Sequence, residues 1–153
     1  MYAIDINRVH ALVDAYKSGR LGGEKMPEGE NPGLDKKSKE NYLYFTLPMA
    51  LNYQRNSYTL WECANKTYHD VETSDVYDIN AVVNMDELQL REKLLKYKVA
   101  LQPNKQPIIW RTLCETIEND FAGDIRKLFS DNDYSVQKVK VYIAKNKKKF
   151  PYL

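Results

Sequence analysis

Cysteine and histidine are scarce in this sequence, and their scarcity excludes whole classes of site. The 153 residues contain two cysteines, Cys63 and Cys114, and two histidines, His10 and His69. A structural zinc or iron–sulfur site takes about four such ligands, so we expect no metal and no cofactor. Each cysteine lies within an apolar helical pattern. This favours two buried thiols over a disulfide or a metal pair, in a reducing, cytoplasmic compartment.

Long apolar runs are missing as well. Residues 1–10 lack the basic start and apolar stretch of a signal peptide, and no run approaches the roughly 20 apolar residues of a membrane helix. Glycine and proline number only six each, and no repeat period is visible, which argues against a solenoid or a low-complexity chain. We therefore expect an ordinary globular chain without a membrane segment.

Helical periodicity is what the sequence does contain. The strongest pattern follows Pro107, where Ile109, Leu113, Ile117 and Phe121 recur at four-residue steps, as on the buried face of a helix. The segment 139–141 could be read as a strand, but one short strand would have no partner. The fold class predicted is all-α, a compact array of several helices, with helices expected over residues 5–18, 41–55, 57–68, 84–103, 107–122 and 135–149.

Helix signals also divide the chain into regions. We expect an N-terminal helix over residues 1–18, a flexible loop over 19–37 that is rich in glycine and proline, and a helical domain over 38–153. Ser38, Ser57, Asn84 and Ser135 are the predicted N-caps, and Pro48 should kink or break the second helix. Because the chain stops just after the helix breaker Pro151, we expect this domain to continue in a longer protein.

Charge is distributed unevenly along the chain. The net charge is +2, yet residues 134–153 contain no acid and six lysines: Lys138, Lys140, Lys145, Lys147, Lys148 and Lys149. Such a block can attract phosphates. The alternative is a solvated helix end, where lysines interact favourably with the helix dipole. The acidic stretch 71–80 is interpreted as surface charge around a short helix or turn.

Two short motifs resemble a known family. Leu51-Asn52-Tyr53-Gln54-Arg55-Asn56-Ser57, followed by Ala64-Asn65-Lys66, is similar to a helix–turn–helix step of the helix-hairpin-helix DNA glycosylases. The run 94–117, with Tyr97, Leu101, Asn104-Lys105 and Ile108-Ile109, fits the next helices, and residues 150–153 would begin the hairpin. The resemblance covers residues 41–153. The glycine-rich hairpin, the catalytic aspartate and lysine, and the iron–sulfur cysteines have no counterpart here.

The resemblance implies a binding role for particular residues. Enzymes of this class extrude a nucleotide and fill the gap with a side chain. Gln54 would be this wedge, with Arg55 and Asn56 beside it, and Lys105 would contact phosphate. Lys138 and Lys145 of the basic terminal helix would also bind DNA. The alternatives are a turn whose Gln and Asn cap backbone groups, an ordinary loop lysine at 105, and a buried Trp61 in place of a base-stacking one.

The function expected is a DNA-glycosylase-like domain that binds double-stranded DNA. It would belong to a base-excision N-glycosylase whose catalytic residues lie beyond this chain, so no catalytic residue is assigned here. The alternative is a non-enzymatic helical module that binds a protein or a nucleic acid. The glycosylase hypothesis depends on one geometric condition: the corner formed by residues 53–57 must project outward, on the same side as the lysine-rich end.

Overall fold

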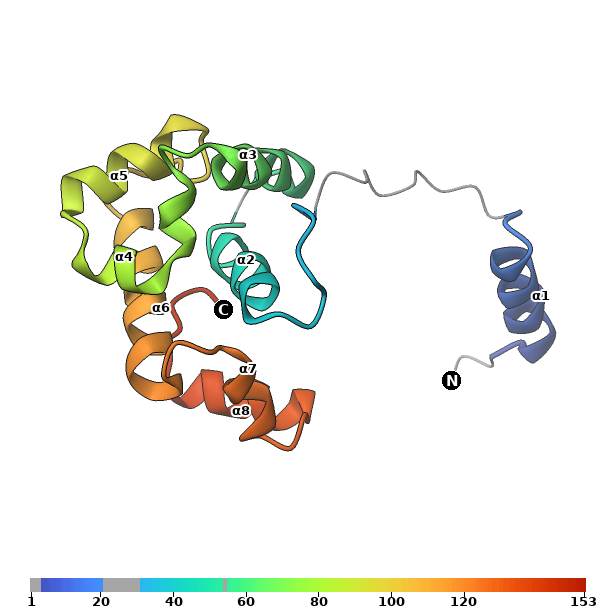
Figure 1. The fold of residues 1–153 in the computed structure, drawn as a ribbon. Helices are drawn as coiled ribbons and strands as arrows, with labels where there is room; N and C mark the ends of the chain where they lie inside the picture. The colour runs from blue at the N-terminus through green and yellow to red at the C-terminus, as the bar shows by residue number, and fades with distance from the viewer. Residues whose placement is uncertain (1–3, 21–30, 54) are drawn as a thin grey trace.

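The structure, a computed structural model, describes residues 4–20, 31–53 and 55–153. All regular structure in these ranges is helical, which confirms the all-α prediction (Figure 1). The elements are α1 (Ile6–Lys17), α2 (Lys39–Met49), α3 (Ser57–His69), the 3-10 helix η2 (Ser74–Tyr77), α4 (Ile79–Asn84), α5 (Glu87–Lys96), α6 (Gln106–Phe121), α7 (Arg126–Ser130) and α8 (Val136–Lys145).

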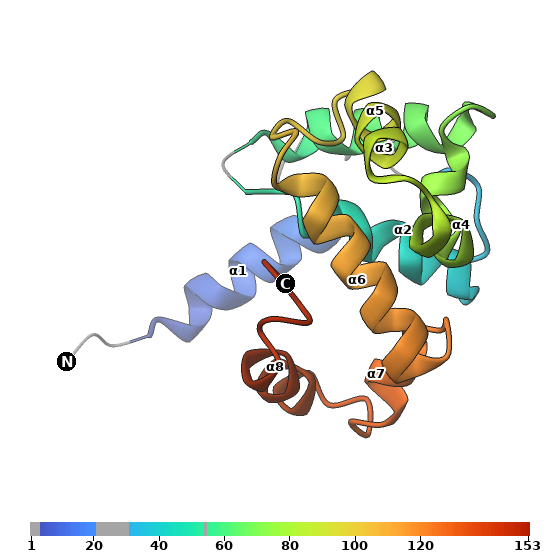
Figure 2. The same cartoon turned by 90° about the vertical axis from the view of Figure 1, so that its left-hand side faces the viewer.

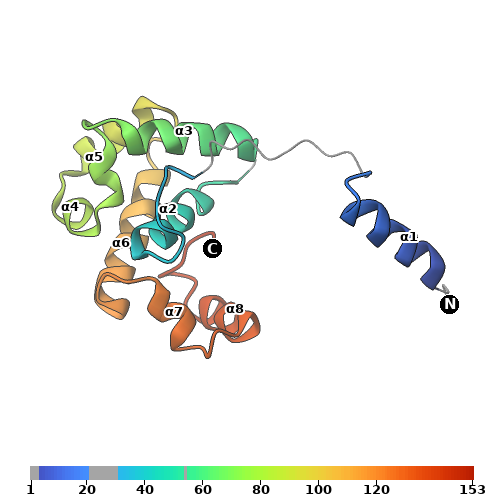
Figure 3. The same cartoon turned by 45° about the vertical axis from the view of Figure 1, so that its right-hand side comes forward.

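Helix α1 forms as the sequence predicts but buries nothing. The Asp5 carboxylate accepts hydrogen bonds from the backbone N–H groups of Asn7 and Arg8 and so caps the helix start. Gly19, with a φ of +68°, follows the helix end, a backbone conformation that glycine adopts without strain. No residue of α1 is buried, and Figures 1 and 3 draw the helix apart from the rest of the chain.

The core is built around α6. The four residues predicted to line its inner face, from Ile109 to Phe121, are all buried. Trp110 is fully buried, and its indole N–H donates to the backbone carbonyl of Val76 at 2.9 Å. This bond ties α6 to η2 and satisfies a polar group that would otherwise be costly to bury. Helix α6 therefore holds η2 in place, and it also packs against α4.

Two helix boundaries differ from the sequence prediction around residue 50. Helix α2 was expected to reach Arg55, but it ends at Met49 because Pro48 cannot continue the hydrogen-bond ladder. The N–H of Leu51 then bonds the Pro48 carbonyl in a turn. Helix α3 is capped by Asn56 and not by Ser57: the Asn56 side chain accepts from the Thr59 N–H.

The region 79–96 is divided differently from the prediction. Asn84 was expected to start a long helix, but it is the last residue of the short helix α4. Asp86 caps α5 instead, since its carboxylate accepts from the N–H groups of Leu88 and Gln89. At the other end of the chain Ser135 caps α8 as predicted, and Val136, the first residue of this helix, is 78% exposed.

The two ends of the helical body differ in the helices they contain. Helices α4 and α5 lie at one end, and α7 and α8 lie at the other (Figures 1 and 3). In Figure 2 the turn between α2 and α3, the end of the chain and α8 lie along the same side of the body. Of the helices that the structure describes, none has both the length and the apolar character needed to cross a membrane.

Candidate nucleic-acid interface

The corner between α2 and α3 follows a buried residue and projects from the body. Leu51 is 1% exposed, while Tyr53, two residues later, is 58% exposed. The Asn52 amide donates to the Ser57 hydroxyl at 2.9 Å and closes the turn. Asn56, predicted as a DNA contact, is exposed and caps α3. Gln54, the predicted wedge, lies outside the described residues.

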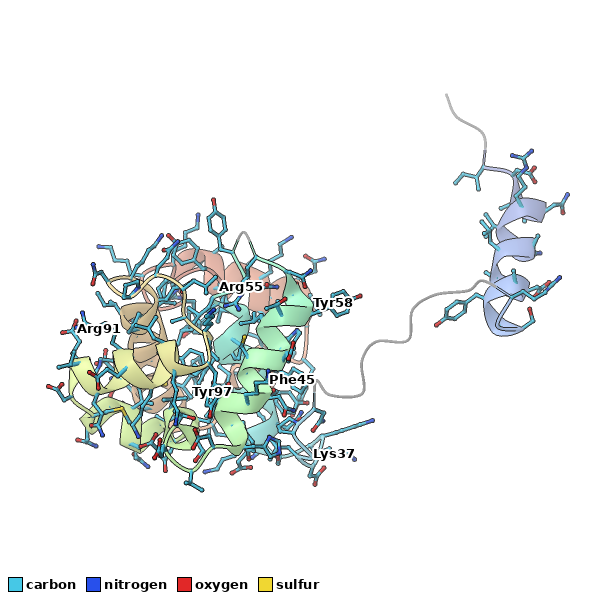
Figure 4. The ribbon with its side chains drawn as sticks, turned by 90° about the horizontal axis from the view of Figure 1, so that it is seen from above. Lys37, Phe45, Arg55, Tyr58, Arg91 and Tyr97 are labelled. Carbon is cyan, nitrogen blue, oxygen red and sulfur yellow. The ribbon has the colours of Figure 1, made fainter. Side chains whose placement is uncertain are left out.

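Arg55 connects this corner to the loop that follows α5. Its guanidinium donates to the carbonyl of Val99 at 2.7 Å and to the carbonyl of Lys98 at 3.0 Å. The same group approaches the Cys63 sulfur at 3.9 Å. Figure 4 labels Arg55 near the start of α3. Hydrogen bonds from a charged donor are stronger than neutral ones. Arg55 therefore holds the corner in position, a role that its motif position did not indicate.

Lys105 contacts an aromatic ring that lies beside the corner. Its ammonium group is 4.5 Å from the ring centroid of Tyr152, within the range of a cation–π interaction. The Tyr152 ring lies 6.0 Å from the ring of Tyr53. The fold thus joins residues 53, 105 and 152 at one place. The sequence analysis includes Tyr53 in the corner motif and Tyr152 in the expected hairpin start, but it assigns a binding role to neither, because neither has a helical spacing that would mark it.

Gln106 is a further residue that the sequence did not single out. It is 5% exposed, and its side-chain oxygen accepts from the N–H groups of Leu101 and Gln102 at 2.5 and 2.9 Å. These bonds satisfy a buried side-chain acceptor, whose burial without a partner would be costly. This pair of bonds fixes the loop that carries Lys105.

The lysines of α8 and its C-terminal end are mostly unpaired. Within the described ranges, Lys138 pairs with Asp133, and Lys149 pairs with Asp120 at 2.7 Å. The hydrogen bond from Lys138 lowers the pKa of Asp133. For four other lysines no ion pair is found with any described residue: Lys140, Lys145, Lys147 and Lys148. Lys138 and Lys145 belong to this helix and are not part of the corner.

The acidic residues near η2 are neutralised by cations of α5. Lys93 binds Asp75 at 2.6 Å, and Lys96 binds Asp70 at 2.7 Å and Glu72 at 2.5 Å. The hydrogen bond from Lys96 is the main cause that lowers the pKa of Asp70 to about 2. These pairs involve α5, at the opposite end of the body from α8 (Figure 1).

The described residues provide little for catalysis by a metal or a thiol. No group of three or more metal-ligating side chains occurs among them. Both cysteines are free; Cys114 is buried as predicted, and Cys63 is half-buried. Burial raises the pKa of the Cys114 thiol well above its usual value, so this thiol stays protonated at neutral pH.

The described residues of the corner can be compared with the condition set by the sequence. The corner projects outward at Tyr53, and it lies on the same side of the body as α8 (Figure 2). Comparisons of the chain with protein-family models, with curated protein sequences and with solved structures gave no match.

Proposed function

We propose that this chain is a DNA-glycosylase-like domain that binds double-stranded DNA, as part of a base-excision N-glycosylase. One observation carries the proposal: the projecting corner and helix α8, which with the residues after it contains four lysines that have no ion pair with a described residue, lie along one side of the body. The acids near η2, in contrast, are paired with lysines of α5. Exposed lysines without carboxylate partners are free to replace the counterions of DNA phosphates.

The residues take different parts in this proposal. Lys145 and its unpaired neighbours on α8 contact phosphates and set the position of the domain on the duplex. Lys105 adds a positive charge at the corner, and Arg55 keeps the corner in shape through the carbonyls of residues 98 and 99. Asn56 caps the start of α3 at the same corner. No residue of this chain is assigned to the cleavage of the N-glycosidic bond.

The test is the salt dependence of binding to a duplex of about 20 base pairs, followed by fluorescence anisotropy. If about five lysines contact phosphates, a plot of log K against log salt should fall with a slope of about −4.5. A duplex with an abasic site should bind more tightly than an intact one, because less energy is spent on opening it. Binding with no such preference would favour a non-enzymatic module, and absence of binding would refute the proposal.

A further inference from the structure

Two exposed tyrosines that lie far apart in the sequence meet beside the corner. Tyr53 follows α2 and is 58% exposed; Tyr152 lies near the end of the chain and is 52% exposed. Their ring centroids are 6.0 Å apart and the ring planes are inclined by 46°. Two large aromatic rings are thus held together while about half of each side chain remains in contact with water. Because the ring planes are inclined, a flat group can stack on the free face of one ring while it contacts the other ring at an angle.

The surroundings of the pair indicate the charge of the ligand. A hollow of ≈ 160 Å³ and a smaller one adjoin the two rings, and the residues that line them are Met49, Ala50, Asn52, Gln102, Lys105, Gln106 and Ile109. This lining holds one cation and no carboxylate. Lys105 lies 4.5 Å from the Tyr152 ring centroid. A flat ligand that carries negative charge fits such a surface better than a cationic or an aliphatic one.

We propose that Tyr53 and Tyr152 form a stacking platform for an unpaired nucleobase of a DNA strand, and that Lys105 contacts the phosphate next to it. This inference rests on the proposed function. Bases inside an intact duplex are covered on both faces by their neighbours, whereas an unpaired base offers a free face for an aromatic side chain. The platform therefore gives the domain a preference for DNA that contains an unpaired base, in addition to its general attraction to phosphates.

The experiment compares two duplexes that differ only in a single unpaired 2-aminopurine at the centre. The full chain should bind the duplex with the unpaired base about tenfold more tightly, as expected for stacking on an aromatic side chain. The double variant Tyr53→Ala/Tyr152→Ala should lose this preference and keep its affinity for the paired duplex within about twofold. The matched control is Tyr16→Ala, which removes a tyrosine that is 77% exposed on α1 and should change neither affinity.

A second variant separates stacking from loss of structure. Tyr53→Phe/Tyr152→Phe keeps both rings and should keep the preference, since stacking uses the ring and not the hydroxyl group. Thermal unfolding of every variant shows whether it is folded under the binding conditions. Equal binding of both duplexes by the unmodified chain, or a preference that survives the alanine double variant, overturns this inference alone. Failure to bind either duplex overturns the proposed function and this inference together.

Discussion

The cations near η2 and the corner bind carboxylates or carbonyls of the protein itself, whereas most of those on α8 and after it do not. Lys93 and Lys96 bind three carboxylates, and Arg55 binds two backbone carbonyls. On α8 and the residues after it, four of the six lysines have no ion pair with a described residue: Lys140, Lys145, Lys147 and Lys148. Both groups consist of cationic side chains, yet only the second contains cations that remain available to a partner.

This difference shows why charge counts are a poor guide to a binding surface. Arg55 stands within the motif that predicts DNA contact, but its guanidinium is already bound in the protein. Breaking those bonds would leave two carbonyls without a donor, which costs free energy. An unpaired surface lysine loses little when it exchanges water for a phosphate. Pairing within the fold therefore decides which cations can serve a partner.

The largest expected effect comes from neutralising the unpaired group. The variant with Lys140, Lys145, Lys147 and Lys148 changed to Gln should lose at least about tenfold in duplex affinity, and its salt slope should become shallower by up to about 3.6. Its melting temperature should stay unchanged, since these lysines form no ion pair with a described residue. Anisotropy titrations at several salt concentrations measure the first effect, and thermal unfolding followed by circular dichroism measures the second.

The control for this variant lies in the other group. Lys93→Gln/Lys96→Gln removes two cations that bind acids, so it should lower the melting temperature and leave duplex affinity within about twofold. The first variant should thus lower duplex affinity without lowering the melting temperature, and the second should lower the melting temperature without lowering duplex affinity. If both variants weaken DNA binding equally, the distinction between paired and unpaired cations is wrong.

The next effect in size concerns Arg55. Arg55→Ala leaves the carbonyls of Lys98 and Val99 without their charged donor, so we expect unfolding to become easier by about 2–3 kcal/mol. Arg55→Lys keeps the charge but cannot reproduce both hydrogen bonds. Its free energy of unfolding should therefore lie between those of Arg55→Ala and the unmodified protein. Urea unfolding measures the free energy. A stability equal to that of the unmodified protein would mean that the corner does not depend on Arg55.

The fold class and the main core could be predicted because they depend on local patterns. The four-residue spacing from Ile109 to Phe121 identified α6, and all four residues are buried. The boundaries near Asn84 could not be predicted in the same way. Asn84 and Asp86 are both good N-caps, and only the packing of α4 against α6 decides that the helix starts after Asp86.

The candidate site could be predicted only in part. The motif drew attention to the corner and to Lys105, which the fold brings near each other. The two tyrosines that complete this surface are 99 residues apart, and nothing local marks them as neighbours. The binding of Arg55 to residues 98 and 99 is likewise a long-range contact. Such pairings depend on the tertiary fold, which spacing within one helix does not specify.

The stability that Asp70 contributes through its pairing should depend on pH. Its pKa is lowered to about 2, mainly by the hydrogen bond from Lys96, from an ordinary value of 3.8. The stabilisation from this carboxylate is therefore present above pH 3.8 and is lost as the pH falls through 2. Asp70→Asn should be less stable than the unmodified protein at pH 7, and the gap should narrow between about pH 4 and pH 2. Urea unfolding at each pH gives this comparison; a constant gap would contradict it.

The smallest expected effect comes from breaking the ion pair of Lys138, the one paired lysine of α8. Asp133 binds Lys138, and both side chains are largely exposed, at 75% and 59%, so the pair contributes little to stability. Asp133 also has a positive φ of 54°, which asparagine tolerates well. Asp133→Asn should therefore leave the melting temperature unchanged, release Lys138 and raise duplex affinity by about twofold. The matched change Asp131→Asn removes an acid from the same turn that forms no ion pair with a described residue; if it raises the affinity as much, the gain comes from net charge and not from the release of Lys138.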